Sequence, residues 1–281
     1  MDGVIILYGK TIKKIRINKG LLLKSVYLGV CSKTNAIKFE KDERILTVDK
    51  FVKVINNLMI SMEEFQWIMN DYEPESKYYY NYKLSKLWNS NKTEAFKDSI
   101  KKLETNPMSI ERVKLASYKL LNSYQENEKT NEKELNIVIN YFSNLSSWTL
   151  EDIKFFANNC YILPYTLMIN LLKESLKVLN KYKYYPNSDK VFATLLINCI
   201  ERMISEKDFK IANTFIGFLN KIAFDITMNG FYLLSKYLEA KIIYLSVDKI
   251  EGKNKLLKIL EISKFLRDGK ISSEIEQLLQ Q

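Results

Sequence analysis

The chain has 281 residues, 47% of them hydrophobic, and a formal net charge of +10 without a single histidine. Histidine is the commonest general base and metal ligand, and the sequence also lacks a Gly-rich phosphate loop, a Cys/His pair and a G-x-S-x-G motif. No catalytic site is therefore predicted, and we expect a protein that is not an enzyme, with no cofactor and no metal ion.

The three cysteines, Cys31, Cys160 and Cys199, stand at unrelated spacings. Such spacing fits neither a disulfide framework nor a zinc site, and it favours a reducing compartment. The N-terminal VIILY run is too short for a signal-peptide core, and no apolar run approaches the roughly 20 residues of a membrane span. We therefore expect a soluble, cytoplasmic protein with no membrane partner.

The positive charge is concentrated near the N-terminus. Residues 1–41 contain nine Lys or Arg residues and two acidic residues, a net +7 of the chain's +10. Such a concentration is typical of a module that neutralises DNA phosphates. A charged face that meets only solvent is the alternative interpretation.

Glycine and proline are unevenly placed. Four of the eight glycines fall at or before Gly29, none lies between Val30 and Ile216, and the whole chain has four prolines. An α/β enzyme needs frequent Gly-rich turns, whereas here a hydrophobic period of 3.6 residues recurs in segment after segment. The sequence therefore predicts an all-α protein.

Five helices are predicted in residues 1–70, at about 10–18, 22–28, 32–41, 48–58 and 61–70. Gly20 is a plausible left-handed stop for the first helix, and a turn at Gly29 precedes the third. Ser61 and Glu64 form a capping-box pattern before the fifth. This order is that of a helix-turn-helix domain whose third helix, short and basic, can enter a DNA major groove. In the fourth helix the side chains expected to be buried are Val48, Phe51, Val52 and Ile55.

Polar residues of the second and third helices are candidates for contact with double-stranded DNA. Asn and Lys side chains can address base edges, and Ser, Thr and Lys side chains can contact phosphates. The candidate DNA-binding residues are Lys24, Ser32, Lys33, Thr34, Asn35 and Lys38. Phe39 is interpreted as a core residue rather than as an intercalating wedge.

A larger helical domain is predicted after the polar segment DYEPES, which holds the first proline of the chain. We place a linker at residues 71–75, between a domain of residues 1–70 and one of residues 76–281. Eleven further helices are predicted, at about 76–90, 93–103, 109–125, 132–142, 149–159, 165–181, 188–204, 206–223, 227–247, 249–265 and 272–279. Short polar turns between them favour a tetratricopeptide-like stack of paired helices, with an irregular bundle as the alternative.

Four segments carry a family resemblance: GKTIKKIRINKGLLLKSV, SKTNAIKFEK, TVDKFVKVINNLMISMEEF and SSWTLEDIKFFANN. They resemble the Rgg (Rgg/GadR/MutR) family of cytoplasmic, peptide-responsive transcriptional regulators of low-GC Gram-positive bacteria. The last segment resembles that family's W-T-x-x-[DE]-I-x-x-F-x-N pattern, so the resemblance spans both predicted domains. The chain departs from the family at Ala36 and Ile37, where a larger apolar residue followed by Ser is commoner, and at Asp42, where Gly is common.

The resemblance implies an ion pair between Arg16 and Glu40, because an Arg and a Glu at the matching family positions pair across the helix-turn-helix domain. It also implies a homodimer formed through the helical body, and a short hydrophobic signalling peptide as ligand. The chain is thus predicted to be a quorum-sensing-type transcriptional regulator that binds promoter DNA. The alternative is a helical-repeat adaptor that binds another protein.

An open helical stack offers an inner surface, and asparagine, which has donors and an acceptor, suits clamping of an extended peptide backbone. The candidate peptide-binding residues are Asn158, Asn159, Asn198, Arg202 and Tyr232, among the apolar residues Leu195, Phe231 and Leu234. Asn198 and Arg202 stand four residues apart on one helical stripe, and Arg202 can hold a carboxylate. Alternatively, the asparagines cap helix ends or face water.

Overall fold

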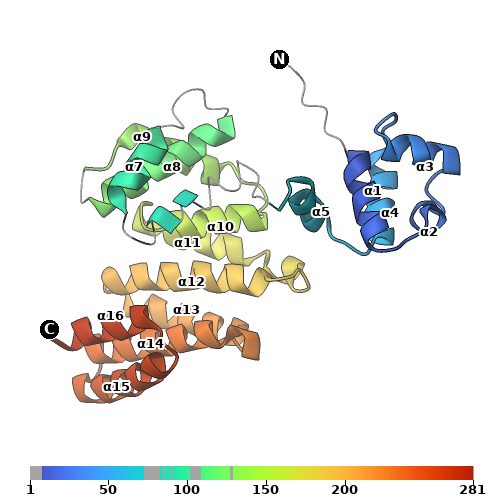
Figure 1. Cartoon of the computed structure of the whole chain (residues 1–281). Helices are drawn as coiled ribbons and strands as arrows, with labels where there is room; N and C mark the ends of the chain where they lie inside the picture. The colour runs from blue at the N-terminus through green and yellow to red at the C-terminus, as the bar shows by residue number, and fades with distance from the viewer. Residues whose placement is uncertain are drawn as a thin grey trace. The chain divides into compact units, whose positions relative to one another are not determined.

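The computed structural model describes residues 8–72, 83–84, 86–88, 90, 92–101, 109–126 and 129–280, and every regular element in these residues is helical (Figure 1). The predicted all-α class is confirmed. The chain divides into two compact units between Phe96 and Lys97. Part of the predicted linker, residues 73–75, and most of the predicted helix 76–90 lie outside the described residues. Within the described ranges, no helix combines the length and apolar character that crossing a membrane requires.

In the N-terminal unit, residues 8–72 form the helices α1 (Tyr8–Asn18), α2 (Leu23–Tyr27), α3 (Lys33–Glu40), α4 (Val48–Asn57) and α5 (Met62–Met69). α1 packs against α3 and α5, and α2 packs against α3 and α4. Gly20 and Gly29 have φ angles of 65° and 71°, the left-handed conformation that glycine adopts without a steric penalty. The predicted stop and turn are therefore present. Of the predicted capping box, the bond from the Glu64 amide to the Ser61 hydroxyl is present, at 3.0 Å.

Aromatic rings pack together with aliphatic side chains in the core of this unit. The Phe39 ring lies 6.3 Å from that of Tyr27 and 6.4 Å from that of Phe51, and Phe39 is 3% exposed. The interpretation of Phe39 as a core residue is confirmed. In α4 the predictions for Val48 and Val52 are wrong, because these side chains are 79% and 40% exposed. The core-facing stripe of α4 centres on Phe51, Val54, Ile55 and Leu58; Val52 points about 100° away from Phe51, and Val48 occupies the first turn.

α3 ends in a turn that is hydrogen-bonded to α1. Asp42 has a φ angle of 60°, and the amides of Asp42 and Glu43 donate to the carbonyl oxygens of Phe39 (2.8 Å) and Lys38 (2.9 Å), as in a Schellman motif. The Asp42 carboxylate also accepts from the amide of Gly9, at 2.8 Å. A Cβ at Gly9 would lie 1.7 Å from the Phe39 carbonyl oxygen, so only glycine permits this approach.

Further along the described residues come α7 (Thr93–Lys101), α8 (Ser109–Gln125), α9 (Glu132–Ser143), α10 (Leu150–Asn159), α11 (Tyr165–Leu176), α12 (Ser188–Ser205), α13 (Phe209–Ile222), α14 (Asn229–Ser246), α15 (Lys249–Phe265) and α16 (Gly269–Gln280). Short 3-10 turns follow α11 (Leu179–Tyr182) and precede α14 (Ile226–Met228). Three predicted boundaries need correction. The helix predicted at 165–181 ends at Leu176, and the one predicted from 206 begins at Phe209, where Asp208 is the N-cap. The last helix begins at Gly269 rather than at 272.

Successive helices stack in pairs. α8 packs on α9, α12 on α13 and α14 on α15 (Figure 1). Between the pairs, α10 contacts α12, and α12 contacts α14. Because each pair contacts mainly the next, the arrangement is that of a helical-repeat stack. The predicted repeat architecture is confirmed.

The segment that resembles the family's W-T-x-x-[DE]-I pattern has a clear structural role. Thr149 and Asp152 form a reciprocal capping box at the start of α10, and Asp152 also accepts a hydrogen bond from the Tyr141 hydroxyl. Trp148 and Phe156 lie 5.9 and 5.6 Å from the ring of Phe142. The pattern therefore begins a helix and supplies its core anchors at the same time.

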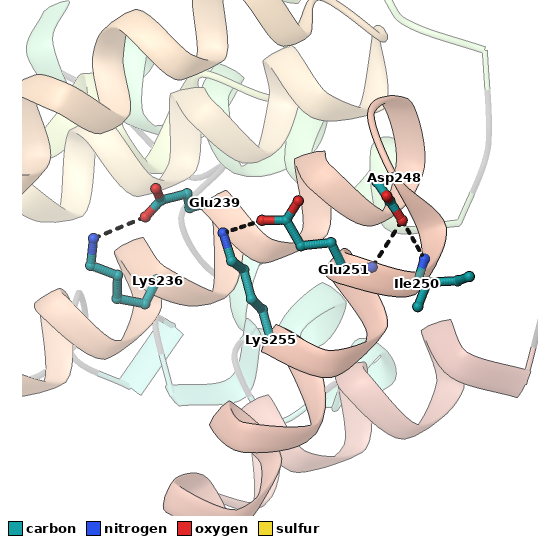
Figure 2. Close-up of polar contacts among 6 residues, drawn as sticks. All are labelled: Lys236, Glu239, Asp248, Ile250, Glu251 and Lys255. Atoms are coloured by element: carbon teal, nitrogen blue, oxygen red, sulfur yellow. Dashed lines mark hydrogen bonds and ion pairs between the residues drawn. The ribbon is translucent and has the colours of Figure 1, made fainter.

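The α14–α15 hairpin shows how tightly the stack is packed. The Asp248 carboxylate caps α15 by accepting from the amides of Ile250 (2.8 Å) and Glu251 (2.9 Å), as Figure 2 shows. A Cβ at Gly252 would lie 2.3 Å from the backbone of Tyr244. The two helices therefore approach each other at a position that only glycine allows.

The substitution Gly9→Ala should separate α1 from the end of α3. We expect the N-terminal unit to lose about 3 kcal/mol of stability, since the added Cβ meets backbone rather than a flexible side chain. Hydrogen exchange of the α1 and α3 amides should accelerate accordingly. In the control Gly217→Ala the Cβ meets open space within α13, so protection there should hold or improve. Unchanged exchange in Gly9→Ala would refute the close approach.

Candidate functional site

A buried ion pair joins α1 to α3. The Arg16 Nε and Nη2 atoms donate to the two carboxylate oxygens of Glu40, at 2.7 and 2.8 Å. The Nη1 atom donates to the Leu21 carbonyl oxygen at 3.0 Å, and Glu40 is 4% exposed. The hydrogen bond to Glu40 raises the pKa of Arg16, and burial, together with the nearby Glu40 carboxylate, raises the pKa of Tyr27. The pair that the family resemblance implies is thus present.

Most of the predicted DNA-binding residues are exposed. Lys24 on α2 is exposed, and so are Ser32, Lys33 and Thr34 at the start of α3 and Lys38 one turn later. The Ser32 hydroxyl caps α3 by accepting from the Asn35 amide, at 3.4 Å. The N-terminal half of α3 therefore presents polar and basic side chains to solvent.

Asn35 is half-buried and has a partner that the sequence analysis missed. Arg44, in the connection between α3 and α4, donates from Nη1 to the Asn35 Oδ1 atom at 2.8 Å. Arg44 and Lys50 also oppose the rise that burial causes in the pKa of Cys31, so both cations lie near the start of α3. Hydrophobic periodicity carries no information about a loop residue such as Arg44, and its charge was the only available signal.

Two predicted peptide-binding residues hold α10 to α12. The Asn198 Nδ2 atom donates to the Ala157 carbonyl oxygen at 2.9 Å, and Arg202 Nη1 donates to the Tyr161 carbonyl oxygen at 3.0 Å. Both acceptors lie at or just beyond the C-terminal end of α10, where helix carbonyls lack intrahelical partners. These contacts give Asn198 and Arg202 a structural role, and any contact with a ligand stays a prediction.

The prediction that Asn159 lines the inner surface needs correction. Asn159 is 1% exposed, its Oδ1 atom accepts from the Ser117 hydroxyl at 2.5 Å, and its Nδ2 atom donates to the Phe155 carbonyl oxygen at 2.7 Å. It therefore joins α8 to α10 inside the protein. Leu195 is fully buried and is likewise a core residue.

Asn158 and Tyr232 are exposed, in contrast to Asn159. The Lys236 ammonium lies 5.2 Å from the centroid of the Tyr232 ring and 2.9 Å from a carboxylate oxygen of Glu239. Figure 2 shows this ion pair on α14, beside the Glu251–Lys255 pair of α15. The described contacts of Tyr232 are thus with its own helix rather than with Asn198 or Arg202.

A groove of about 590 Å³ lies where α8, α9 and α12 meet the connection between α10 and α11. Its lining residues are Leu120, Tyr124, Lys129, Thr130, Glu132, Leu135, Tyr161, Ile162, Leu163, Pro164 and Arg202. Of the predicted peptide-binding residues it contains Arg202 alone. The other residues that line the groove were not predicted from the sequence, because they come from three segments far apart in the chain.

Arg202 stands at this groove in a fixed position. Its Nη2 atom lies 2.8 Å from a Glu206 carboxylate oxygen, and within the described part of the chain its buried Nε atom has no hydrogen-bond partner. Beside it, the Tyr161 hydroxyl donates to Glu201 at 3.0 Å, and burial raises the pKa of the Glu201 carboxyl. The groove therefore combines apolar walls with a guanidinium that is held by the Tyr161 carbonyl oxygen and the Glu206 carboxylate.

The chain thus joins a unit with the helix order of a helix-turn-helix domain to a helical-repeat stack that has a groove. A sequence model described as the C-terminal domain of the HTH-type transcriptional regulator Rgg matches residues 77–277. The chain therefore belongs to the Rgg family of transcriptional regulators. Family membership confirms the resemblance seen in the sequence and places the chain among regulators rather than enzymes.

Solved structures share the fold along nearly the whole chain. A protein of Listeria monocytogenes EGD-e, described as a transcriptional regulator, is 22% identical with a TM-score of 0.84, covering 98% of this chain and 96% of that one. The Streptococcus dysgalactiae SHP pheromone receptor Rgg2 is 16% identical with a TM-score of 0.78, covering 96% and 97%. PrgX in complex with cCF10 is 18% identical with a TM-score of 0.70, covering 98% and 99%.

The substitution Glu40→Ala should destabilise the N-terminal unit by roughly 3–5 kcal/mol, because it leaves the Arg16 charge buried without its partner. Replacing both residues, in Arg16→Met/Glu40→Leu, should cost less than the single substitution, since no charge is then left unpaired. Urea unfolding of the wild type, Arg16→Met, Glu40→Leu and the Arg16→Met/Glu40→Leu double variant gives the coupling energy. Additive effects of the two sites would show that the pair does not act as a unit.

Proposed function

We propose that the protein binds promoter DNA as a homodimer and changes that binding when a short hydrophobic peptide occupies its helical-repeat domain. In this proposal residues 1–70 are the DNA-binding domain, residues 71–75 the linker, and residues 76–281 the peptide-binding and dimerisation domain. The protein would act in the cytoplasm. The observation that carries the proposal is the exposed, basic start of α3, held in place by the Arg16–Glu40 pair.

DNA binding is supported by charge and geometry together. The net +7 of residues 1–41 lies in the unit that contains α3, and the exposed Lys24, Lys33 and Lys38 belong to it. In helix-turn-helix proteins the third helix lies in the major groove, and its N-terminal residues contact base edges. A single such helix reads few base pairs, whereas a two-fold dimer presents two of them about one DNA turn apart, or a multiple of it.

Peptide binding is supported by the groove at α8, α9 and α12. Its apolar walls suit hydrophobic side chains, while the positively charged guanidinium of Arg202, which lines the groove, suits a carboxylate or carbonyl oxygen of a peptide. Among the similar structures, Rgg2 is described as a pheromone receptor, and another is described as a peptide pheromone/receptor complex. We extend that ligand class to this chain.

Two substitutions should separate base recognition from phosphate contact. Asn35→Ala should reduce discrimination between the promoter region upstream of the gene and random DNA, by roughly 1–3 kcal/mol if a bidentate base contact is lost. Lys24→Ala should weaken binding to both DNAs alike and flatten the salt dependence. Fluorescence anisotropy titrations at several salt concentrations measure both effects. Identical behaviour of the two variants would disprove this division of roles.

Removing the guanidinium at the groove should weaken peptide binding. Arg202→Met loses a charge-assisted donor, so affinity for a synthetic hydrophobic peptide encoded next to the gene should fall roughly 10- to 100-fold. The control Lys236→Met removes a cation that pairs with Glu239 and does not line the groove. Calorimetry gives the affinities, and circular dichroism verifies folding.

Two results would count against the peptide proposal. Equal affinity of wild type and folded Arg202→Met would move the site away from the groove. A wild type that binds no such peptide and binds a protein partner, with no preference among DNA sequences, would favour the adaptor alternative.

A further inference from the structure

The start of α3 holds a contact that bears on how DNA sequence is recognised. Arg44 Nη1 donates to Asn35 Oδ1 at 2.8 Å, across the turn that ends α3. Asn35 lies in the first turn of α3, the part of a recognition helix that meets base edges. Arg44 is exposed on the same part of the molecule.

The backbone places Arg44 beside Asn35 before any DNA is bound. The turn at Asp42 is closed by the bonds of the Asp42 and Glu43 amides to the end of α3. It is also tied to α1 through the bond between the Gly9 amide and the Asp42 carboxylate. Arg44 directly follows this turn, which is held by two sets of hydrogen bonds. The backbone position from which the Arg44 side chain extends is therefore set by the turn.

The chemistry of the two side chains makes the contact directional. An asparagine amide has an oxygen that only accepts and a nitrogen that only donates, and a guanidinium can only donate. Arg44 therefore selects the rotamer in which Oδ1 faces it, with Nδ2 on the other side of the amide. Turning the amide over would set the Nδ2 donor against a donor. A charge-assisted bond of 2.8 Å is stronger than one between neutral groups.

We propose that Arg44 is a positioning residue that fixes the orientation of the Asn35 amide, and so determines which base-edge pattern Asn35 recognises. This inference rests on the proposed function, in which α3 enters the major groove. Each base edge presents its donors and acceptors in a fixed order. An amide that is already held in the matching orientation therefore discriminates between bases better than one that rotates. Arg44 thus contributes to specificity through Asn35.

A plain phosphate contact by Arg44 makes a different prediction. Phosphates carry no sequence information, so loss of such a contact weakens binding to every sequence by the same factor. Lys50 is the matched control, because it is a second exposed cation near the start of α3. The measured quantity is therefore the ratio of the affinities for two duplexes: the region upstream of the gene, and a scrambled duplex of equal length and composition.

The test is a double-mutant cycle on the full chain. Arg44→Ala should lower the affinity ratio about two- to tenfold, the range expected when one side chain loses its fixed orientation. In an Asn35→Ala background, Arg44→Ala should leave the ratio unchanged, because the residue that it positions is gone. Lys50→Ala should lower both affinities by one factor and keep the ratio.

Three outcomes would overturn the inference. An unchanged ratio in Arg44→Ala, with both affinities reduced, would make Arg44 a phosphate contact only. A reduction of the ratio that persists in the Asn35→Ala background would show that Arg44 contacts bases by itself. Equal binding of both duplexes by the wild type would overturn the proposed function along with the inference, and it is distinguished from the first two by the wild-type ratio alone.

Discussion

The orientation of α3 depends on the ion pair between Arg16 and Glu40. α3 buries only Ala36, Phe39 and Glu40, so few apolar contacts hold it against the rest of the unit. The bidentate geometry fixes direction as well as distance, because both carboxylate oxygens are engaged at once. Such a pair adds little net stability when desolvation is counted, and its value here lies in where it holds the helix.

The departures from the family pattern have physical consequences in the same region. Asp42, at a position where glycine is common, keeps the left-handed φ of 60° and adds a carboxylate that caps α1. Ala36 is fully buried, and Ile37 is 39% exposed, where the family more often has a serine. The exposed surface of α3 therefore has its own composition, supplemented by Arg44. We therefore expect this protein to recognise a DNA sequence that differs from those recognised by other members of the family.

Sequence alone predicted the helices well and their contacts unevenly. Periodicity and caps gave the helical class, and the family resemblance gave the Arg16–Glu40 pair. The prediction that both Asn158 and Asn159 line the inner surface was wrong for one of them. At this helix end Asn158 is exposed, whereas Asn159, one position later, is buried. A periodic pattern of 100° per residue cannot assign polar residues near the boundary of a face. Arg44 and the groove depend on loops and on distant segments, which leave no local pattern.

The central claim is that two copies of α3 enter the major groove of promoter DNA. Dimethyl sulfate methylates guanine N7 in that groove, so protection of the region upstream of the gene, by the full-length protein, tests the claim directly. Two clusters of protected guanines, centred about 10 base pairs or a multiple of that distance apart, are the predicted result. Binding of the same DNA without any protection of guanine N7 would contradict it.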